Sequence, residues 1–294
     1  MKKSRPLEGI HVFEIASMIF GPLAGQYLGD MGADVIKLEP PEGDLTRSIG
    51  PTRSPLMGRL LPHKQSQQAQ HRSGSKEARR SGDPTAPDLQ DRCFAALAAH
   101  ARSQSTRARL HGADEDQSRP GVLPCEGLCD DGLYAGRPAY DDIIQAASGL
   151  ADLQSVIVGQ PRFMPTIIAD KVSGVHAAYA IVPALMHRLR TGEGQQVDIA
   201  MFETMAAFNM MEHQWGHVFE PPQGSMGYPP VSTASRRPYK TRDGFLALLP
   251  YSDSNWHRFF ELAGDPRSWM IHASRPSPRG RSTSERCGTR LKGR

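Results

Sequence analysis

Residues 10–39, IHVFEIASMIFGPLAGQYLGDMGADVIKLE, decide the fold of this chain. They open with one strand-like apolar run, IHVFEIAS, and close with another, DVIKLE. Between the two runs, four apolar side chains recur at helical spacing: Leu23, Tyr27, Leu28 and Met31. Gly32 follows at a plausible position for the end of a helix. Two short strands joined by a helix form a right-handed parallel unit, so the stretch predicts an α/β domain built on a parallel sheet.

The whole chain has 294 residues, 38% of them hydrophobic, which is enough to bury a substantial core. Its net charge of +4 suggests a polyanion as partner. That charge is concentrated in residues 274–294, which hold six arginines and one lysine against a single acid. Aromatic residues that could stack on bases are nearly missing from the basic stretches, so we expect no nucleic-acid partner.

The sequence also bears on membranes and location. It contains no run of about 18 apolar residues, so neither a membrane-spanning segment nor a membrane partner is predicted. The first residues are basic but lack the apolar block of a signal peptide. We therefore expect a cytoplasmic protein.

Residues 59–131 differ in composition from their surroundings. Only nine of these 73 residues are Val, Leu or Phe, and Ile, Met, Tyr and Trp do not occur. A segment with so few large apolar side chains cannot fold by burial alone. We expect it to be disordered or to be out-of-frame sequence, and the basic tail at 274–294 has the same character.

Regular patterning continues in residues 132–225. The run YDDIIQAASGL, residues 140–150, predicts a helix. A longer helix is predicted over residues 171–190 by an apolar stripe: Val175, Tyr179, Val182, Met186 and Leu189. A turn, a strand and a third helix from about Phe202 to His217 follow.

Residues 226–273 read as the start of a second, smaller domain. A hairpin is predicted there, with Asp243 and Gly244 in its turn. The run SDSNWHRFFELAG then predicts a helix that begins at Ser252 or Asp253 and ends at Gly264.

Four blocks of the sequence resemble, in the right order, the family III CoA-transferases. This CaiB/BaiF family includes formyl-CoA:oxalate and carnitine CoA-transferases and, as a branch, 2-methylacyl-CoA racemases. The blocks are PLEGIHVFEIASMIFGPLAGQYLGDMGADVIKLEPPEGDLTR, AGRPAYDDIIQAASGL, PTIIADKVSGVHAAYAIVPALMHRLRTGEGQQVDIAMFE and RRPYKTRDGFLALLPYSDSNWHRFFELAG.

The resemblance implies a Rossmann-like parallel-sheet large domain, with residues 1–58 as its N-terminal part and 132–225 as its catalytic part. It also implies the start of a smaller α+β domain at 226–273. The family's N-x-R-P-G motif, which helps to hold CoA, has no counterpart within residues 59–131.

Through the match of ADKVSG, the resemblance places the family's nucleophilic aspartate at Asp170. CoA then moves between an acyl-CoA and a carboxylic acid by way of an aspartyl anhydride and an aspartyl-CoA thioester. A carboxylate nucleophile must be ionised, positioned and shielded from water. By spacing alone, a helix cap that accepts an N–H from Val172 or Ser173 is the simpler interpretation. The resemblance favours the nucleophile.

Six more residues occupy positions where the family contacts CoA: Met18, Ile19, Phe20, Gly21, Tyr140 and Asp141. Gly21 opens a helix whose backbone amides could face a phosphate. Core packing is the alternative for Met18 and Phe20. The racemase branch has a His-Asp pair where this chain has Tyr140 and Asp141, so a racemase-like isomerase is the less favoured function.

We predict no metal site, because Cys125 and Cys129 lack a second ligand pair and no H-E-x-x-H occurs. No permanently bound cofactor is predicted either, and CoA or acyl-CoA enters as a substrate, together with a carboxylic acid. The resemblance implies a homodimer of interlocked chains if the protein is intact. An inactive, degenerate relative without enzymatic function remains the main alternative, given the unusual composition of 59–131 and 274–294.

Overall fold

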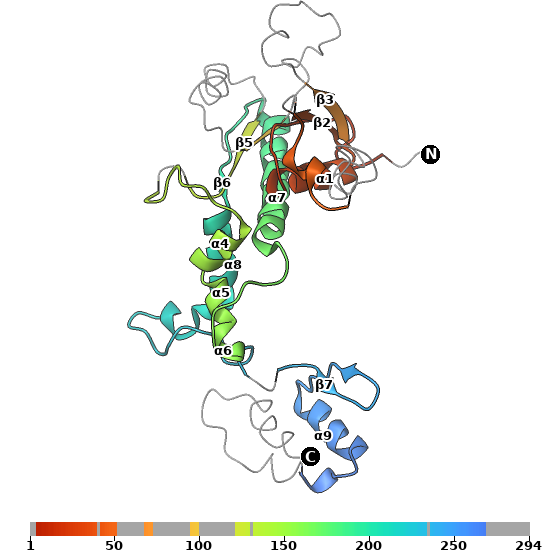
Figure 1. Cartoon of the computed structure of the whole chain (residues 1–294), viewed down its shortest axis with the longest axis vertical. Helices are drawn as coiled ribbons and strands as arrows, with labels where there is room; N and C mark the ends of the chain where they lie inside the picture. Colours follow the sequence, from red (N-terminus) through yellow and green to blue (C-terminus); the bar gives the residue numbers. More distant parts are fainter. Residues whose placement is uncertain are drawn as a thin grey trace, which may run out of the picture. The chain divides into compact units, whose positions relative to one another are not determined.

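The computed structural model describes residues 4–39, 42–51, 68–72, 95–99, 121–129, 132–233 and 236–268 (Figure 1). The chain divides into two compact units. The first consists of Met1–Gly149 and Phe163–Phe208, and the second of Leu150–Arg162 and Asn209–Arg294. All of the site residues predicted from the sequence belong to the first unit.

The first unit is built on a six-stranded sheet with the order β3-β2-β1-β4-β5-β6, in which every pairing is parallel. Its strands are β1 (His11–Glu14), β2 (Asp34–Glu39), β3 (Gln68–Arg72), β4 (Ala95–Ala99), β5 (Gly121–Glu126) and β6 (Ile199–Ala200). The chain progresses outward from β1 to β3 and then returns to continue on the other side of β1. This is the doubly wound, Rossmann-like order, which confirms the predicted α/β class.

The predicted strand–helix–strand unit at the N-terminus is confirmed. Helix α1 (Phe20–Asp30) joins β1 to β2, and His11 lies opposite Asp34 in their parallel register. The helix buries Leu28 fully against the sheet. Gly32 follows the helix with φ of +106°, a left-handed conformation that glycine adopts without a steric penalty.

Strands β3, β4 and β5 lie within residues 59–131, where the composition predicts no regular structure. The difference has a physical reason at β4, which reads AALAA. Four of its five residues are alanines, which are apolar but do not belong to the large apolar residues on which the composition argument rests. Most of the remaining segment, and all of 274–294, lies outside the described residues.

Helix α7 (Ile168–Thr191) packs against α1, and Figure 1 shows the two helices near one another. Its buried positions are mostly small: Ala169, Ser173, Gly174, Ala177, Ala178, Ile181 and Leu185. At Gly174 an added Cβ would lie 3.0 Å from the carbonyl oxygen of Phe20, so the two backbones approach closely. Only a residue without a side chain fits that spacing unchanged.

The apolar stripe that predicts this helix does not face the core. Val175, Tyr179, Met186 and Leu189 are exposed, Tyr179 by 73%. The helix itself is therefore confirmed but its orientation differs from that of an ordinary amphipathic helix. Helical periodicity is judged from large apolar residues, which are expected to be buried. The buried face of α7 consists instead mostly of small residues, because they allow α1 to approach closely.

The described ranges also contain the helices α4 (Asp141–Ala147) and α8 (Met201–His213). Two short 3-10 helices are η1 (Leu45–Ser48) and η2 (Trp215–Val218). α4 buries Ile144 completely and leaves Ile143 exposed. The division between the two units falls within α8, after Phe208.

The second unit contains the predicted hairpin and capped helix. Strands β7 (Tyr239–Lys240) and β8 (Phe245–Leu246) pair antiparallel. α9 (Asp253–Leu262) begins with a capping box between Ser252 and Asn255. The short helices α5 (Leu150–Leu153) and α6 (Ser155–Val158) also belong to this unit. None of the helices in the described ranges has the length and hydropathy needed to cross a membrane.

Candidate functional site

The turn between β1 and α1 lies at the carboxyl edge of the sheet, beside the point where the strand order reverses between β1 and β4. Open parallel sheets bind ligands at such a point. The turn is tightly folded: Met18 has φ of +64°, which is uncommon for a residue other than glycine. A Cβ at Gly21 would overlap the side chain of Ala16, so the entry to α1 admits only glycine there.

The four predicted CoA contacts of this turn differ in their surroundings. Ile19 and Phe20 are buried in the core, 8% and 6% exposed, as the packing alternative for Phe20 requires. Met18 is half-buried. Of this turn, the side chain of Met18 and the main chain near Gly21 are thus better placed to reach a ligand than the side chains of Ile19 and Phe20.

Asp170 is the third residue of α7, and its side chain is half-buried. The N-cap position of the helix belongs to Ile167, whose side chain makes no capping hydrogen bond. The backbone N–H of Asp170 instead donates to Oδ1 of Asp141, at 3.0 Å. A carboxylate from α4 therefore satisfies one of the free N–H groups at the start of α7.

Two of the predicted site residues, Asp170 and Asp141, are thus in direct contact, and Tyr140 takes no part in that contact. Asp141 is 6% exposed, and its other oxygen, Oδ2, accepts a hydrogen bond of 2.6 Å from Nε2 of Gln145. Tyr140, directly before it, is 60% exposed. Sequence reasoning missed Gln145, although its i+4 spacing from Asp141 on a predicted helix is a signal that could have found it.

The two halves of the predicted site are connected through helix packing. Gly174 lies one helical turn after Asp170 and contacts Phe20 in the first turn of α1. The start of α1 is therefore held at a fixed spacing from the helix that carries Asp170.

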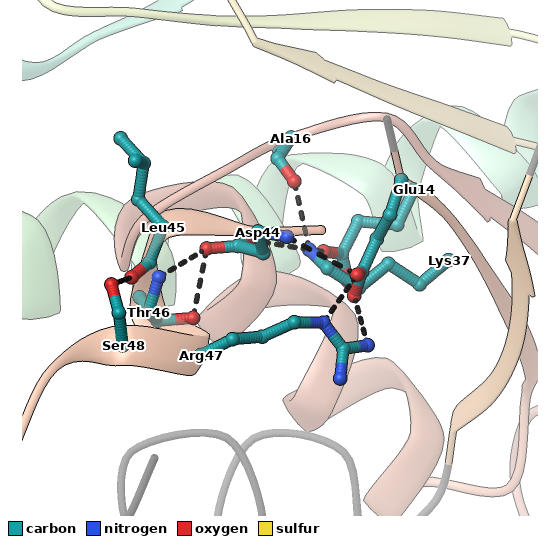
Figure 2. A network of polar contacts seen from close by, with 9 residues as sticks. Glu14, Ala16, Lys37, Asp44, Leu45, Thr46, Arg47 and Ser48 are labelled. Carbon is teal, nitrogen blue, oxygen red and sulfur yellow. Dashed lines mark hydrogen bonds and ion pairs between the residues drawn. The ribbon is translucent and has the colours of Figure 1, made fainter. Parts of the chain in front are cut away.

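A buried charged cluster, not predicted from the sequence, supports the turn after β1. Figure 2 shows Lys37 between Glu14, Ala16 and Asp44. Its Nζ donates to Oε1 of Glu14 at 2.5 Å and to the carbonyl oxygen of Ala16 at 2.8 Å, and lies 3.1 Å from Oδ2 of Asp44. The bond to Ala16 ties the cluster to the turn that carries Met18.

The cluster continues through Asp44 to Thr46 and through Glu39 to Arg47. Asp44 Oδ1 accepts hydrogen bonds of 2.8 Å from both the backbone N–H and the hydroxyl of Thr46. The Arg47 guanidinium donates from Nε to Oε2 of Glu39 at 2.6 Å and from Nη2 to Oε1 at 2.9 Å. Such a two-pronged contact is among the strongest that a carboxylate makes.

The cluster lowers the pKa of two of its carboxyl groups. Burial raises the pKa of Asp44, but the N–H and hydroxyl of Thr46 and the charge of Lys37 outweigh it and hold that pKa below its ordinary value. Burial likewise raises the pKa of Glu39, and the bonds from Arg47 and from the backbone of Asp44 lower it overall. Both groups are therefore anions at neutral pH.

Among the residues that the structure describes, no group of three or more His, Cys, Asp or Glu side chains could hold a metal ion. His213 accepts a hydrogen bond at Nδ1 from the backbone of Tyr228, and His176 contacts the carbonyl oxygen of Val172. Both histidines thus have local structural partners. Cys125 and Cys129 form no disulfide within the described part of the chain.

Comparisons with known proteins agree on one family. The family model described as CoA-transferase family III matches residues 7–78 and 97–292. A protein of Agrobacterium fabrum named succinate–glutarate CoA-transferase is 31% identical over 276 residues, which cover 88% of this chain. The same match covers 66% of that protein, so this chain spans just under two thirds of the length of its curated relative.

Solved structures share the fold. A CAIB/BAIF family protein from Brucella suis superposes with a TM-score of 0.72 at 24% identity, covering 99% of this chain and 76% of that one. Rv3272 from Mycobacterium tuberculosis superposes with a TM-score of 0.70 at 24% identity, covering 90% and 71%.

Proposed function

Because this chain belongs to family III of the CoA-transferases, we propose that it moves CoA between an acyl-CoA and a carboxylic acid, with Asp170 as the nucleophile. The observation that carries the proposal is the placement of Asp170. Its half-buried carboxylate stands in the first turn of α7, next to the buried Asp141 and one turn from the contact with α1. A nucleophile there is fixed in position and partly shielded from water.

The reaction needs four balanced steps. The Asp170 carboxylate attacks the thioester carbonyl of the donor, which forms a mixed anhydride and releases CoA thiolate. The thiolate attacks the Asp170 carbonyl of the anhydride, which gives an aspartyl-CoA thioester and frees the donor acid. The acceptor carboxylate attacks this thioester, which forms a second anhydride and releases CoA thiolate. The thiolate then attacks the acceptor's carbonyl in that anhydride. The products are the new acyl-CoA and free Asp170.

The other site residues receive supporting roles in this proposal. The backbone of Gly21 at the start of α1, together with Met18, would contact CoA, because helix N-termini favour anionic groups such as phosphates. The exposed Tyr140 would meet the substrate, and Asp141 would hold the start of α7. Ile19 and Phe20 would shape the same turn from the core side.

We also propose a second copy of the chain as partner. The observation that supports it is the stripe of exposed apolar side chains along α7, formed by Val175, Tyr179, Met186 and Leu189. A run of exposed apolar residues on one helix face is typical of a surface that another protein covers. The cytoplasmic location expected from the sequence stays a prediction.

The test is transferase activity with and without the nucleophile. Succinyl-CoA with glutarate is the first pair to assay, because the Agrobacterium relative carries those acids in its name. Asp170→Asn keeps the shape and hydrogen bonding of the side chain but cannot form an anhydride, so CoA exchange should be lost while CoA binding persists. Asp142→Asn is the matched control, since Asp142 is exposed on the neighbouring helix.

Hydroxylamine added during turnover should convert Asp170 of the unchanged protein to a hydroxamate, which mass spectrometry locates. Full activity of the Asn variant would refute the nucleophile. Calorimetric titration with CoA separates the alternative of an inactive relative: heat of binding without any exchange, or no binding at all, would favour it. Exchange of the α-proton of a 2-methylacyl-CoA would favour the racemase-like alternative.

A further inference from the structure

Gln145 is fully buried and bridges α4 to the chain that enters α7. Its Nε2 donates to Oδ2 of Asp141 at 2.6 Å and to the carbonyl oxygen of Thr166 at 3.4 Å. Its Oε1 accepts from the backbone N–H of Met164 at 2.8 Å. Both ends of the side-chain amide are thus in use within one small region.

The start of helix α7, next to Gln145, has no capping side chain at its N-cap position. Ile167 at the N-cap position makes no side-chain hydrogen bond to the helix, so α7 depends on Asp141 for the acceptor that binds the N–H of Asp170. Gln145 fixes this acceptor from one side and the backbone at 164–166 from the other. The first turn of α7 is therefore positioned by α4 rather than by its own sequence.

We propose that Gln145 is a positioning residue for Asp170: it orients the Asp141 carboxylate and the chain at 164–166 so that the first turn of α7 presents Asp170 to the substrate. The inference rests on the proposed function, because it assigns a role in the same reaction. Gln145 does not touch the reacting atoms in this role. It acts through the two hydrogen bonds that it shares with Asp141 and Met164.

The chemistry of the position favours an amide over other side chains. The side chain must donate to a carboxylate and accept from an N–H at the same time, and a neutral glutamine does both. A glutamate there would face Asp141 with a second negative charge in a buried site, unless it carried a proton. A protonated glutamate would restore the hydrogen bonds to Asp141 and from Met164, so the function of Gln145→Glu should depend on pH.

The experiment compares two variants with a matched control. Gln145→Met removes all three side-chain hydrogen bonds and keeps the approximate volume. Gln145→Glu keeps the shape and adds the charge. Gln160→Glu makes the same charge change at an exposed position. Steady-state kinetics are measured from pH 5 to 8 with saturating acyl-CoA, and hydrogen–deuterium exchange is measured for the segment that contains 164–171.

For Gln145→Met we expect kcat to fall on the order of 10- to 100-fold with KM for acyl-CoA changed less than about threefold, since misplacing a reacting group by about 1 Å costs a similar factor. For Gln145→Glu we expect kcat, relative to the unchanged protein at the same pH, to recover as the pH falls. Gln160→Glu should behave like the unchanged protein at every pH.

Amide hydrogen exchange tests the positioning role of Gln145 without requiring transferase activity. In Gln145→Met, the amides of Met164 and Asp170 should exchange at least tenfold faster than in the control, while the segment around Lys37 keeps its protection. Unchanged exchange at Met164 and Asp170 overturns the positioning role, whether or not the protein transfers CoA. Faster exchange with unchanged kcat in an active protein overturns it too. An unchanged protein that shows no aspartyl intermediate would instead refute the proposed function.

Discussion

Lys37 and Glu14 form an ion pair in which neither side chain reaches solvent, with exposures of 1% and 0%. Lys37 is a β2 residue and Glu14 the last residue of β1, and the two lie opposite one another in the register of these neighbouring parallel strands. All three donor positions of the ammonium are occupied, by Glu14, Ala16 and Asp44. A lysine is tolerated in a buried parallel sheet only with such complete pairing.

Removal of the cation should therefore be strongly destabilising. Lys37→Met leaves Glu14 and Asp44 buried near one another without their shared partner, and breaking a buried pair in this way costs roughly 3–5 kcal/mol. Urea unfolding followed by circular dichroism measures the loss. Lys240→Met, at an exposed position of β7, should change stability by less than about 0.5 kcal/mol. Equal effects of the two substitutions would contradict the account of the cluster.

Stability should fall in acid through Asp44 and Glu39. The pKa of each is lowered in the folded protein relative to the unfolded chain, where the values are about 3.9 and 4.3. A lowered pKa contributes stability that is complete above the unfolded value and is lost as pH falls through the folded value. Unfolding free energy should thus be flat for these two groups above about pH 5 and decrease below pH 4. In Asp44→Asn the decrease should be shallower, and an unchanged slope would argue against this origin.

The exposed stripe on α7 should mediate self-association. Tyr179→Glu or Met186→Glu places a charge in the middle of the stripe, which should shift a dimer toward monomer because burying an unpaired carboxylate is costly. Light scattering coupled to gel filtration, at several protein concentrations, reports the mass. His187→Glu puts the same charge on an exposed residue beside the stripe and serves as the control. A monomeric unchanged protein would remove the basis of this prediction.

Gly174 should tolerate no larger residue. Gly174→Val would push against the Phe20 carbonyl and the Leu23 side chain, and such overpacking typically costs about 1–3 kcal/mol. The thermal midpoint should fall by several degrees, whereas Ala180→Val, in a half-exposed position of the same helix, should shift it little. A thermal midpoint for Gly174→Val equal to that of the control would mean that α1 and α7 separate easily.

Local sequence signals predicted the parts of the fold that local interactions determine. The unit from β1 to β2, with its closing Gly32, is recognisable because strand and helix periodicities alternate within thirty residues. The capped helix α9 is recognisable because Ser252 and Asn255 lie close in sequence. In both cases neighbouring residues decide the outcome.

The rest depended on contacts between distant segments. Lys37 and Glu39 interrupt an apolar strand, which signals buried charge, but their partners Glu14 and Arg47 cannot be identified before the strands are placed side by side. The buried face of α7 could not be predicted for a similar reason. The close approach at Gly174 is a property of two helices, and nothing in the pattern of either one reveals it.

The order of the strands has a consequence for how the chain is made. β1 lies in the middle of the sheet, and its second neighbour, β4, begins only at Ala95. While the chain is being synthesised, β1 can pair with β2 as soon as β2 has been made. The other edge of β1 stays open until β4 has been made as well. Open edges of apolar strands pair readily with other chains, and non-local sheets assemble slowly. Lower temperature during expression weakens the association of exposed apolar strands and should therefore raise the yield of folded protein.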